Sequence, residues 1–250
     1  MNHVWQLAKA DGKHLMRDPM LALSVAAPIL LLAVLRFGFP LLSETVRDRA
    51  GIDVNVYSDF LLANALLLVA LMEGILAGLL MLDERDENML AYYSVTPLTK
   101  QGYLAYRLAV PFLLSGVGAA AVLWGSGLHA GTFWESAPGL ALVALEGPLY
   151  GLAMAALAAN KVEGLAWSKA IGVSVLIPAA SLFLPGAWGW ICAVFPTFWP
   201  VQTFLRAATQ LQAASTPRAA AVFSVLFSAG LLYHLLLLWI GYLAFLRRAG

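Results

Sequence analysis

The amino-acid sequence predicts an all-α integral membrane protein with six transmembrane helices. Its mean hydropathy is +0.80, and 61% of the 250 residues are apolar whereas only 12% are charged, about half the charged share of a soluble domain. One crossing of a ~30 Å hydrocarbon layer takes about 20 helical residues, so the apolar sequence is sufficient for about six spans. Ten-residue segments with alternating apolar and polar residues are absent from the sequence, which disfavours a transmembrane barrel.

The six apolar stretches are each long enough to cross the membrane as a helix. No internal repeat or low-complexity linker divides them, so residues 1–250 are expected to form a single transmembrane domain. The predicted spans cover about residues 20–42, 60–82, 104–128, 137–158, 165–187 and 220–246.

The segment before the first span predicts an interfacial helix. Apolar residues recur there at near-helical spacing, while Lys9, Lys13 and Arg17 follow one another at intervals of four on another side. The alternative is a short cytoplasmic tail whose pattern arose by chance. Because this charged flank is long for a cleaved signal, we expect the first span to be retained.

Residues 184–218 are too apolar for a solvated loop but are interrupted by Pro185, Pro196 and Pro200. Short half-buried or re-entrant helices are therefore expected before the last span. The aromatic residues in this segment, Trp188, Trp190, Phe195, Phe198 and Trp199, favour the membrane interface. This segment is predicted to lie at the outer face.

The distribution of lysine and arginine predicts that both termini lie in the cytoplasm, because basic residues accumulate on that side. The residues then placed inside are Lys9, Lys13, Arg17, Arg85, Lys100, Arg107, Lys161, Lys169, Arg247 and Arg248. Those placed outside are Arg36, Arg47, Arg49, Arg206 and Arg218. The region 36–49 fits this assignment least well, since it places three arginines outside.

The loop after the second span has the densest cluster of charges in the chain, Asp83, Glu84, Arg85, Asp86 and Glu87. An apolar segment follows and ends near Pro97, which disfavours helix at the residue before it. This pattern predicts a short helix parallel to the membrane, with the acids at its N-terminus, where the helix dipole favours negative charge. The alternative is that these charges only prevent the second span from sliding through the bilayer.

This loop resembles the coupling helix of ABC-2 type permeases, the membrane subunits of ATP-binding cassette transporters, in particular those that export drugs or antibiotics. The resemblance rests on Glu84, Arg85, Asp86, Leu90, Val95, Thr96, Pro97 and Leu98. Asn88 and Met89 stand where that family has Gly-Thr. Asparagine tolerates the left-handed backbone conformation better than most residues, so we expect the turn to be preserved.

The resemblance implies an exporter of drugs, lipids or hydrophobic peptides in the cytoplasmic membrane of a bacterium. It further implies that the permease dimerises with a second copy or a sister permease and is driven by two copies of an ATPase subunit. The chain has no G-x-x-x-x-G-K-[ST] phosphate loop, so ATP and Mg²⁺ are expected in the ATPase and no cofactor is expected here. The net charge of +1 provides no excess of basic residues for binding nucleic acid, so nucleic acid is not expected as a partner. Membrane lipid is expected to surround the spans. The implied ATPase-coupling residues are Glu84, Arg85, Asp86, Glu87, Pro97 and Leu98.

Two acidic residues lie inside predicted spans, Glu73 in the second and Glu146 in the fourth. An ionised acid at such a depth costs about 2.5 to 3.5 kcal/mol or more, so each must face protein or water or be protonated. Both are candidate residues of a translocation path. Alternatively they join helices through Arg36, Arg107 or His234.

His234 has no second histidine three or four residues away, so an interhelical hydrogen bond is expected there rather than a metal site. The only cysteine is Cys192, which excludes an intrachain disulfide. Two other functions remain open: an intramembrane enzyme that uses Glu73 and Glu146, and a scaffold subunit that does not transport.

Overall fold

The computed structural model describes residues 19–89, 99–129, 131–212 and 217–249, and these residues form helices and connecting turns without a strand. The predicted interfacial helix in residues 1–18 lies outside the described residues. The α-helices are α2 (Pro19–Ala33), α3 (Phe39–Ala50), α4 (Ser58–Asp86), α6 (Thr99–Gly125), α7 (Phe133–Leu157), α8 (Lys161–Val173), α9 (Ile177–Phe183), α10 (Phe198–Gln212) and α11 (Pro217–Ala249). A π-helical turn, η1 (Val34–Gly38), and 3₁₀ helices η2 (Val54–Tyr57), η3 (Ser174–Leu176) and η4 (Gly186–Val194) complete them.

Within the described residues, six helical stretches are long and apolar enough to cross a membrane, which confirms the predicted fold class. They run over Ala26–Ala50, Val54–Asp86, Gln101–Gly125, Phe133–Leu157, Lys161–Phe183 and Ala220–Arg247. The fifth ends at Phe183, earlier than predicted, because Leu184 is extended before Pro185, as residues preceding proline prefer.

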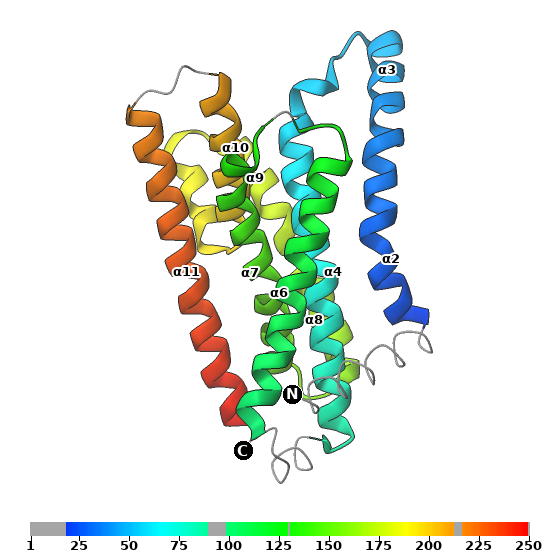
Figure 1. Cartoon of the computed structure of the whole chain (residues 1–250), viewed down its shortest axis with the longest axis vertical. Helices are drawn as coiled ribbons and strands as arrows, with labels where there is room; N and C mark the ends of the chain where they lie inside the picture. The colour runs from blue at the N-terminus through cyan, green and yellow to red at the C-terminus, as the bar shows by residue number, and fades with distance from the viewer. Residues whose placement is uncertain (1–18, 90–98, 130, 213–216, 250) are drawn as a thin grey trace.

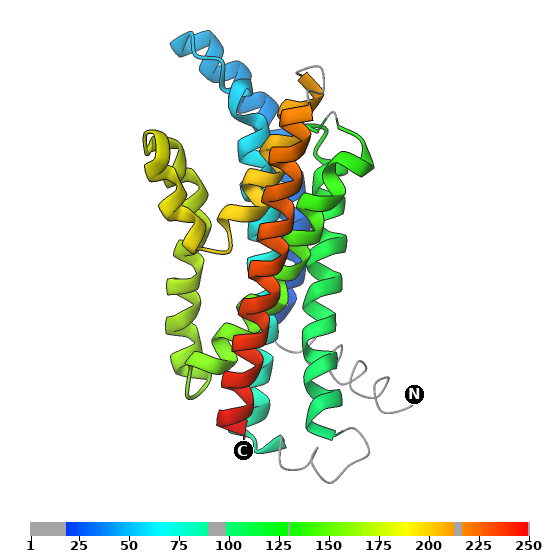
Figure 2. The same ribbon diagram turned by 90° about the vertical axis from the view of Figure 1, so that its left-hand side faces the viewer.

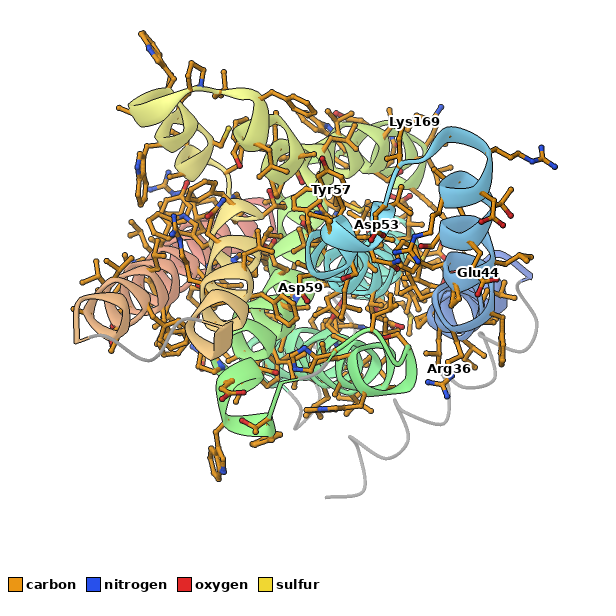
Figure 3. All side chains as sticks on the ribbon, turned by 90° about the horizontal axis from the view of Figure 1, so that it is seen from above. Arg36, Glu44, Asp53, Tyr57, Asp59 and Lys169 are labelled. Atoms are coloured by element: carbon orange, nitrogen blue, oxygen red, sulfur yellow. The ribbon has the colours of Figure 1, made fainter. Side chains whose placement is uncertain are left out.

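The first span, predicted to end near residue 42, is longer. Helix continues through the π-helical turn η1 and α3 to Ala50, where Gly51 adopts a left-handed conformation (φ 68°) and ends it. At ~1.5 Å per residue, Pro19–Ala50 extends roughly 48 Å, more than the ~30 Å hydrocarbon layer. The charged last turns of α3 therefore extend beyond the membrane as helix. Figure 3 shows Arg36 and Glu44 along this outlying helix.

Helices α4 and α7 form the centre of the bundle. In each of them, 78% of the membrane-spanning core of the helix is buried within the chain, whereas the corresponding share is 11 to 28% in the other four spans. Figure 1 shows α4, α6 and α7 side by side, with α2–α3 and α11 on opposite flanks. In Figure 2, α8, α9 and η4 (yellow-green to yellow) form a separate layer at one side.

Glycines allow the two central helices to approach each other closely. Gly74 and Gly78 of α4 face Gly147 and Gly151 of α7: a β-carbon at Gly74 would lie 2.5 Å from the carbonyl oxygen of Gly147. Each helix thus presents a small-x-x-x-small pair, the usual basis of close packing between membrane helices.

The segment before the last span forms short helices, as predicted. The 3₁₀ helix η4 is followed by α10, which packs against α7 and α11 through Val201, Phe204 and Ala207. The indole of Trp199 donates to the carbonyl of Ala193 (3.0 Å), and the Tyr233 hydroxyl donates to Val194. In Figure 1 α10 lies at the same end of the bundle as α3, opposite the C-terminal end of α11.

Candidate functional site

The charged cluster Asp83–Glu87 lies at the C-terminal end of α4, with its first four residues inside the helix. The prediction that these acids begin a new helix is therefore wrong: α4 continues to Asp86 because neighbouring helices supply the partners that their carboxylates need. Lys161 of α8 provides two of these contacts. Its Nζ lies 2.9 Å from Asp83 Oδ2, and its backbone N–H donates to Asp86 Oδ2 over 3.0 Å. Asp86 thus satisfies the N-terminus of α8, where an acid is favourable.

Glu84 joins α4 to α6. It accepts a hydrogen bond from the Tyr103 hydroxyl (2.6 Å) and two from the Arg107 guanidinium, one of them from Nε over 3.0 Å. The Arg107 side chain is only 4% exposed and that of Glu84 15%. A two-point arginine–carboxylate contact with little water has both strength and a fixed geometry.

Arg85 joins α4 to α7 through the backbone. Its guanidinium donates to the carbonyl oxygens of Ala155 (3.0 Å) and Ala158 at the end of α7. These carbonyls belong to the last turn of a helix, where no intrahelical N–H remains to bind all of them. Together, Asp83, Glu84, Arg85 and Asp86 attach the end of α4 to three other helices, and we call these four residues with Tyr103, Arg107 and Lys161 the α4 clamp.

Beyond the clamp the chain turns out of α4 at Glu87 and Asn88, both exposed. Asn88 has a φ of 56°, a left-handed conformation, and its N–H donates to the Arg85 carbonyl over 3.0 Å. The expectation that asparagine preserves this turn is confirmed. The predicted coupling residues Pro97 and Leu98 lie outside the described residues, as do Leu90, Val95 and Thr96.

Glu73 faces α6. It lines a cavity of about 50 Å³ between α4 and α6 together with Arg107 and Pro111, and its Oε2 is buried without a hydrogen-bond partner. The space is large enough for a water molecule, which would satisfy this atom, and Glu73 and Arg107 are the polar residues of an otherwise apolar lining. Glu73 therefore lies beside the clamp, along the same face of α4.

Glu146 is bound to His234 of α11, as the sequence suggested. His234 Nε2 lies 3.1 Å from Glu146 Oε1, its Nδ1 lies 2.7 Å from the carbonyl oxygen of Gly230, and both side chains are fully buried. A carbonyl can only accept, so Nδ1 carries a proton. The Glu146–His234 contact then needs one further proton, on either partner, and the pair as a whole is neutral.

The polar residues of the membrane region are thus divided between two sides of the central helices. Glu73 faces α6, whereas Glu146 faces α11, so their contacts do not form the paired carboxylates of a hydrolase. Arg36 lies away from both glutamates. It belongs to η1, where its guanidinium lies beside Gly127 of the loop between α6 and α7. Lys169, assigned to the cytoplasmic side, lies inside α8 and, in Figure 3, at the periphery.

Sequence reasoning missed Tyr103 and Lys161 as members of the clamp. A signal for each was present. Tyr103 precedes Arg107 by four residues and so shares its helical face, while Lys161 directly follows Asn160, whose side chain accepts from Glu163 N–H as the N-cap of α8. What the sequence did not provide was the pairing of these faces with the end of α4.

Comparisons with known proteins give one family and two relatives. Residues 11–242 match the family described as fluoroquinolones export permease protein Rv2686c-like. Two relatives in Mycobacterium tuberculosis, the fluoroquinolones export permease proteins Rv2686c (strain ATCC 25618 / H37Rv) and MT2760 (strain CDC 1551 / Oshkosh), are each 29% identical over 191 residues. The aligned region covers 75% of this chain and 76% of each relative. No solved structure gives a significant match.

The family match includes the first five spans, most of the sixth and the clamp, so it concerns nearly the whole membrane domain and not a local motif. The chain belongs to the Rv2686c-like family of fluoroquinolone export permease proteins, and the predicted resemblance to drug export permeases is confirmed.

Proposed function

We propose that the chain is the membrane subunit of an ATP-driven exporter and that its ATPase pushes on the segment Glu87–Leu98. The single observation that carries this proposal is the α4 clamp. It fixes the base of that segment to α4, α6, α7 and α8 at once. A displacement applied at Glu87 would therefore move several spans together instead of bending one loop.

In this proposal Glu84, Arg85 and Asp86 transmit motion, since their side chains are bound within the permease. Exposed Glu87 and the residues that follow, including Pro97 and Leu98, contact the ATPase. ATP and Mg²⁺ bind that subunit, because the sequence has no phosphate loop. The clamp end of the bundle faces the cytoplasm, with both termini, and α3 and α10 lie toward the outside.

We further propose a dimer of permease subunits with two ATPase subunits. Helices α2–α3, α8–α9 and α11 bury little of their surface within one chain, so area remains on them for a second copy or a sister permease as well as for lipid. The substrate class follows the printed names of the relatives: a fluoroquinolone or a similar amphipathic aromatic molecule, moved outward. Glu73 and Glu146 are proposed polar groups along the moving helices.

Site-directed crosslinking tests the coupling proposal. Cys192 is the only native cysteine, so a Cys192→Ala background accepts single probes. Glu87→Cys should crosslink to the co-expressed ATPase and react with thiol reagents from the cytoplasmic side. Asp53→Cys, exposed at the opposite end, is the matched control and should do neither. Labelling of Glu87→Cys only from the outside would refute the proposal.

Transport itself is tested with purified permease and ATPase in proteoliposomes. Fluoroquinolone-stimulated ATP hydrolysis is expected, and Arg107→Met should reduce it while assembly with the ATPase persists. A stable assembly whose rate of ATP hydrolysis does not change with any amphipathic substrate would indicate that the permease is a scaffold subunit. Activity of the permease without any ATPase would indicate an enzyme.

A further inference from the structure

A cavity of about 430 Å³ lies between α7, α8 and α11, away from the clamp. Small residues from all three helices line it, where larger side chains would otherwise fill the space: Ala153 and Ala156 of α7, Ala170 of α8, and Gly241 and Ala244 of α11. Its volume is within the range of pockets that hold drug-sized molecules, roughly 300 to 1,000 Å³. The cavity therefore results from the sequence of three separate helices and not from one missing side chain.

Aromatic side chains bound the cavity at two places. Trp167 of α8 lines it, and its indole N–H donates to Glu163 over 3.3 Å, which holds the ring in position. Phe195 and Pro196 line it from the connection before α10. That connection is fixed by Thr197, whose hydroxyl donates to the Ser174 carbonyl over 2.8 Å. Rings held in this way favour stacking on a flat aromatic molecule.

Two of the lining residues, Tyr150 and Ser174, carry hydroxyl groups. Tyr150 is 3% exposed, and its hydroxyl lies near Ser174 and Glu146 without a hydrogen bond of normal geometry. Ser174 donates to the Ile171 carbonyl over 2.6 Å, so its oxygen can still accept. A buried hydroxyl without a partner costs about 1 to 3 kcal/mol. A ligand with a carbonyl oxygen would recover part of this cost by accepting from Tyr150, whereas an acyl chain would recover none.

The cavity is accessible from the lipid. Leu157 and Ile240 line it and remain 43% and 52% exposed. Its residues on α7 and α11 belong to the last parts of those helices, so it lies in the half of the membrane that contains the clamp. An amphipathic drug that has partitioned into that leaflet could enter without passing through water.

We propose that this cavity binds a flat aromatic small molecule that enters from the clamp-side leaflet, and that it is the site from which the substrate is taken for export. This inference rests on the proposed function for its substrate class. The volume fits one such molecule, the aromatic residues provide stacking surfaces, and Tyr150, a lining residue, carries the hydroxyl for a directional contact.

Binding is measured first on the full-length permease in lipid nanodiscs without ATPase, by equilibrium dialysis of ciprofloxacin. Ala170→Leu, which fills the cavity, should weaken binding by about tenfold or more, since over-packing of a filled site costs more than ~1.4 kcal/mol. Tyr150→Phe should weaken it about three- to tenfold, the share of one hydrogen bond. Ala166→Leu, on the exposed part of α8 outside the cavity, is the matched control and should bind like the unsubstituted protein.

All variants are first checked for monodisperse size-exclusion profiles, and Ala156→Leu replaces Ala170→Leu if the latter does not fold. Equal ciprofloxacin affinity in the cavity-filled and control variants would overturn the inference. So would a co-purified lipid that occupies the cavity and is not displaced by the drug. Drug-stimulated ATP hydrolysis of the complex is measured in parallel. If drug-stimulated hydrolysis and export persist unchanged in the cavity-filled variant, the proposed binding site is wrong but the proposed export function is retained. If neither the unsubstituted protein nor any variant binds or exports the drug, the proposed function is wrong.

Discussion

The central helices α4 and α7 and the outer helices α8 and α11 differ in burial although all four cross the membrane. Hydropathy does not separate them. The membrane-spanning core of α7 has a mean hydropathy of 1.7 and is 78% buried. That of α11 has a higher mean hydropathy, 2.1, but is only 17% buried. Because lipid is as apolar as the protein interior, apolar length determines which segments cross but not which of them pack together.

Small residues and polar contacts distinguish the central pair. Gly74 and Gly78 meet Gly147 and Gly151 at backbone distance. The clamp then fixes the end of α4, while the buried pair Glu146–His234 connects α7 to α11 inside the membrane. The comparison indicates a rigid centre with more loosely attached outer helices. Four substitutions test this difference between centre and periphery.

The largest effect is expected at the contact of the two central helices. Gly74→Ala places a methyl group 2.5 Å from the Gly147 carbonyl oxygen and 2.6 Å from Tyr150 Cβ. Neither atom can rotate away, so the helices must separate, and we expect a loss of about 3 kcal/mol, the upper part of the over-packing range. Thermal unfolding in detergent, followed by size-exclusion chromatography, measures it.

The matched control is Gly172→Ala in the outer helix α8, where the nearest atom would be Leu71 Cδ2 at 3.9 Å. This variant should be neutral or slightly stabilising, since alanine is favoured over glycine in a helix by up to ~1 kcal/mol. Equal destabilisation by the two substitutions would contradict the distinction between centre and periphery.

The sequence predicted the six spans because their length and hydropathy follow directly from the thickness of the bilayer. It also predicted the left-handed Asn88 and the His234 contact, each from the chemistry of a single side chain. It did not predict that helix continues through α3. Charged residues mark where a span leaves the membrane, but they are compatible with further helix outside the membrane. Nor did it identify Gly74 and Gly78 as the contact with α7, since small residues in other spans gave the same signal.

The charged cluster Asp83–Glu87 was singled out from the sequence but assigned the wrong local structure. The acids were expected at a helix N-terminus, and they lie in the last turn of α4. Their stabilisation comes from Arg107 and Lys161, which are distant in sequence, so no local rule could have indicated it.

The second largest effect is expected at the inner part of the clamp. Arg107→Met removes both contacts to Glu84 and leaves a carboxylate with only Tyr103 beside it. Hydrogen bonds to charged groups contribute about 1.5 to 3 kcal/mol, and we expect a loss of roughly 2 kcal/mol. The thermal unfolding midpoint should recover when Glu84→Gln is added, because no unpaired charge then remains. A double variant that is as unstable as Arg107→Met alone would show that the arginine stabilises by packing and not through Glu84.

A smaller loss is expected where an outer helix meets the centre inside the membrane. His234→Leu removes the hydrogen-bonded contact to Glu146. Interhelical hydrogen bonds in membranes contribute ~0.6 kcal/mol on average and up to ~1.7, so we expect about 1 kcal/mol. Glu146→Gln should be milder than His234→Leu in the same unfolding assay, because its amide still donates to Nε2. The reverse order would show that Glu146 is charged and that His234 is an imidazolium.

The smallest effect is expected at the outer part of the clamp. The side chains of Lys161 and Asp83 are 38% and 39% exposed, and exposed ion pairs contribute at most ~1 kcal/mol because water screens them. Lys161→Ala also retains the backbone N–H that donates to Asp86, so stability should fall by about 0.5 kcal/mol or less, and less still at high salt. The effect on the proposed transport differs from the effect on stability if α8 moves separately from the centre. In that case Lys161→Ala should abolish the stimulation of ATP hydrolysis by the drug although the protein remains folded. A Lys161→Ala variant as unstable as Arg107→Met would instead place α8 within the rigid centre.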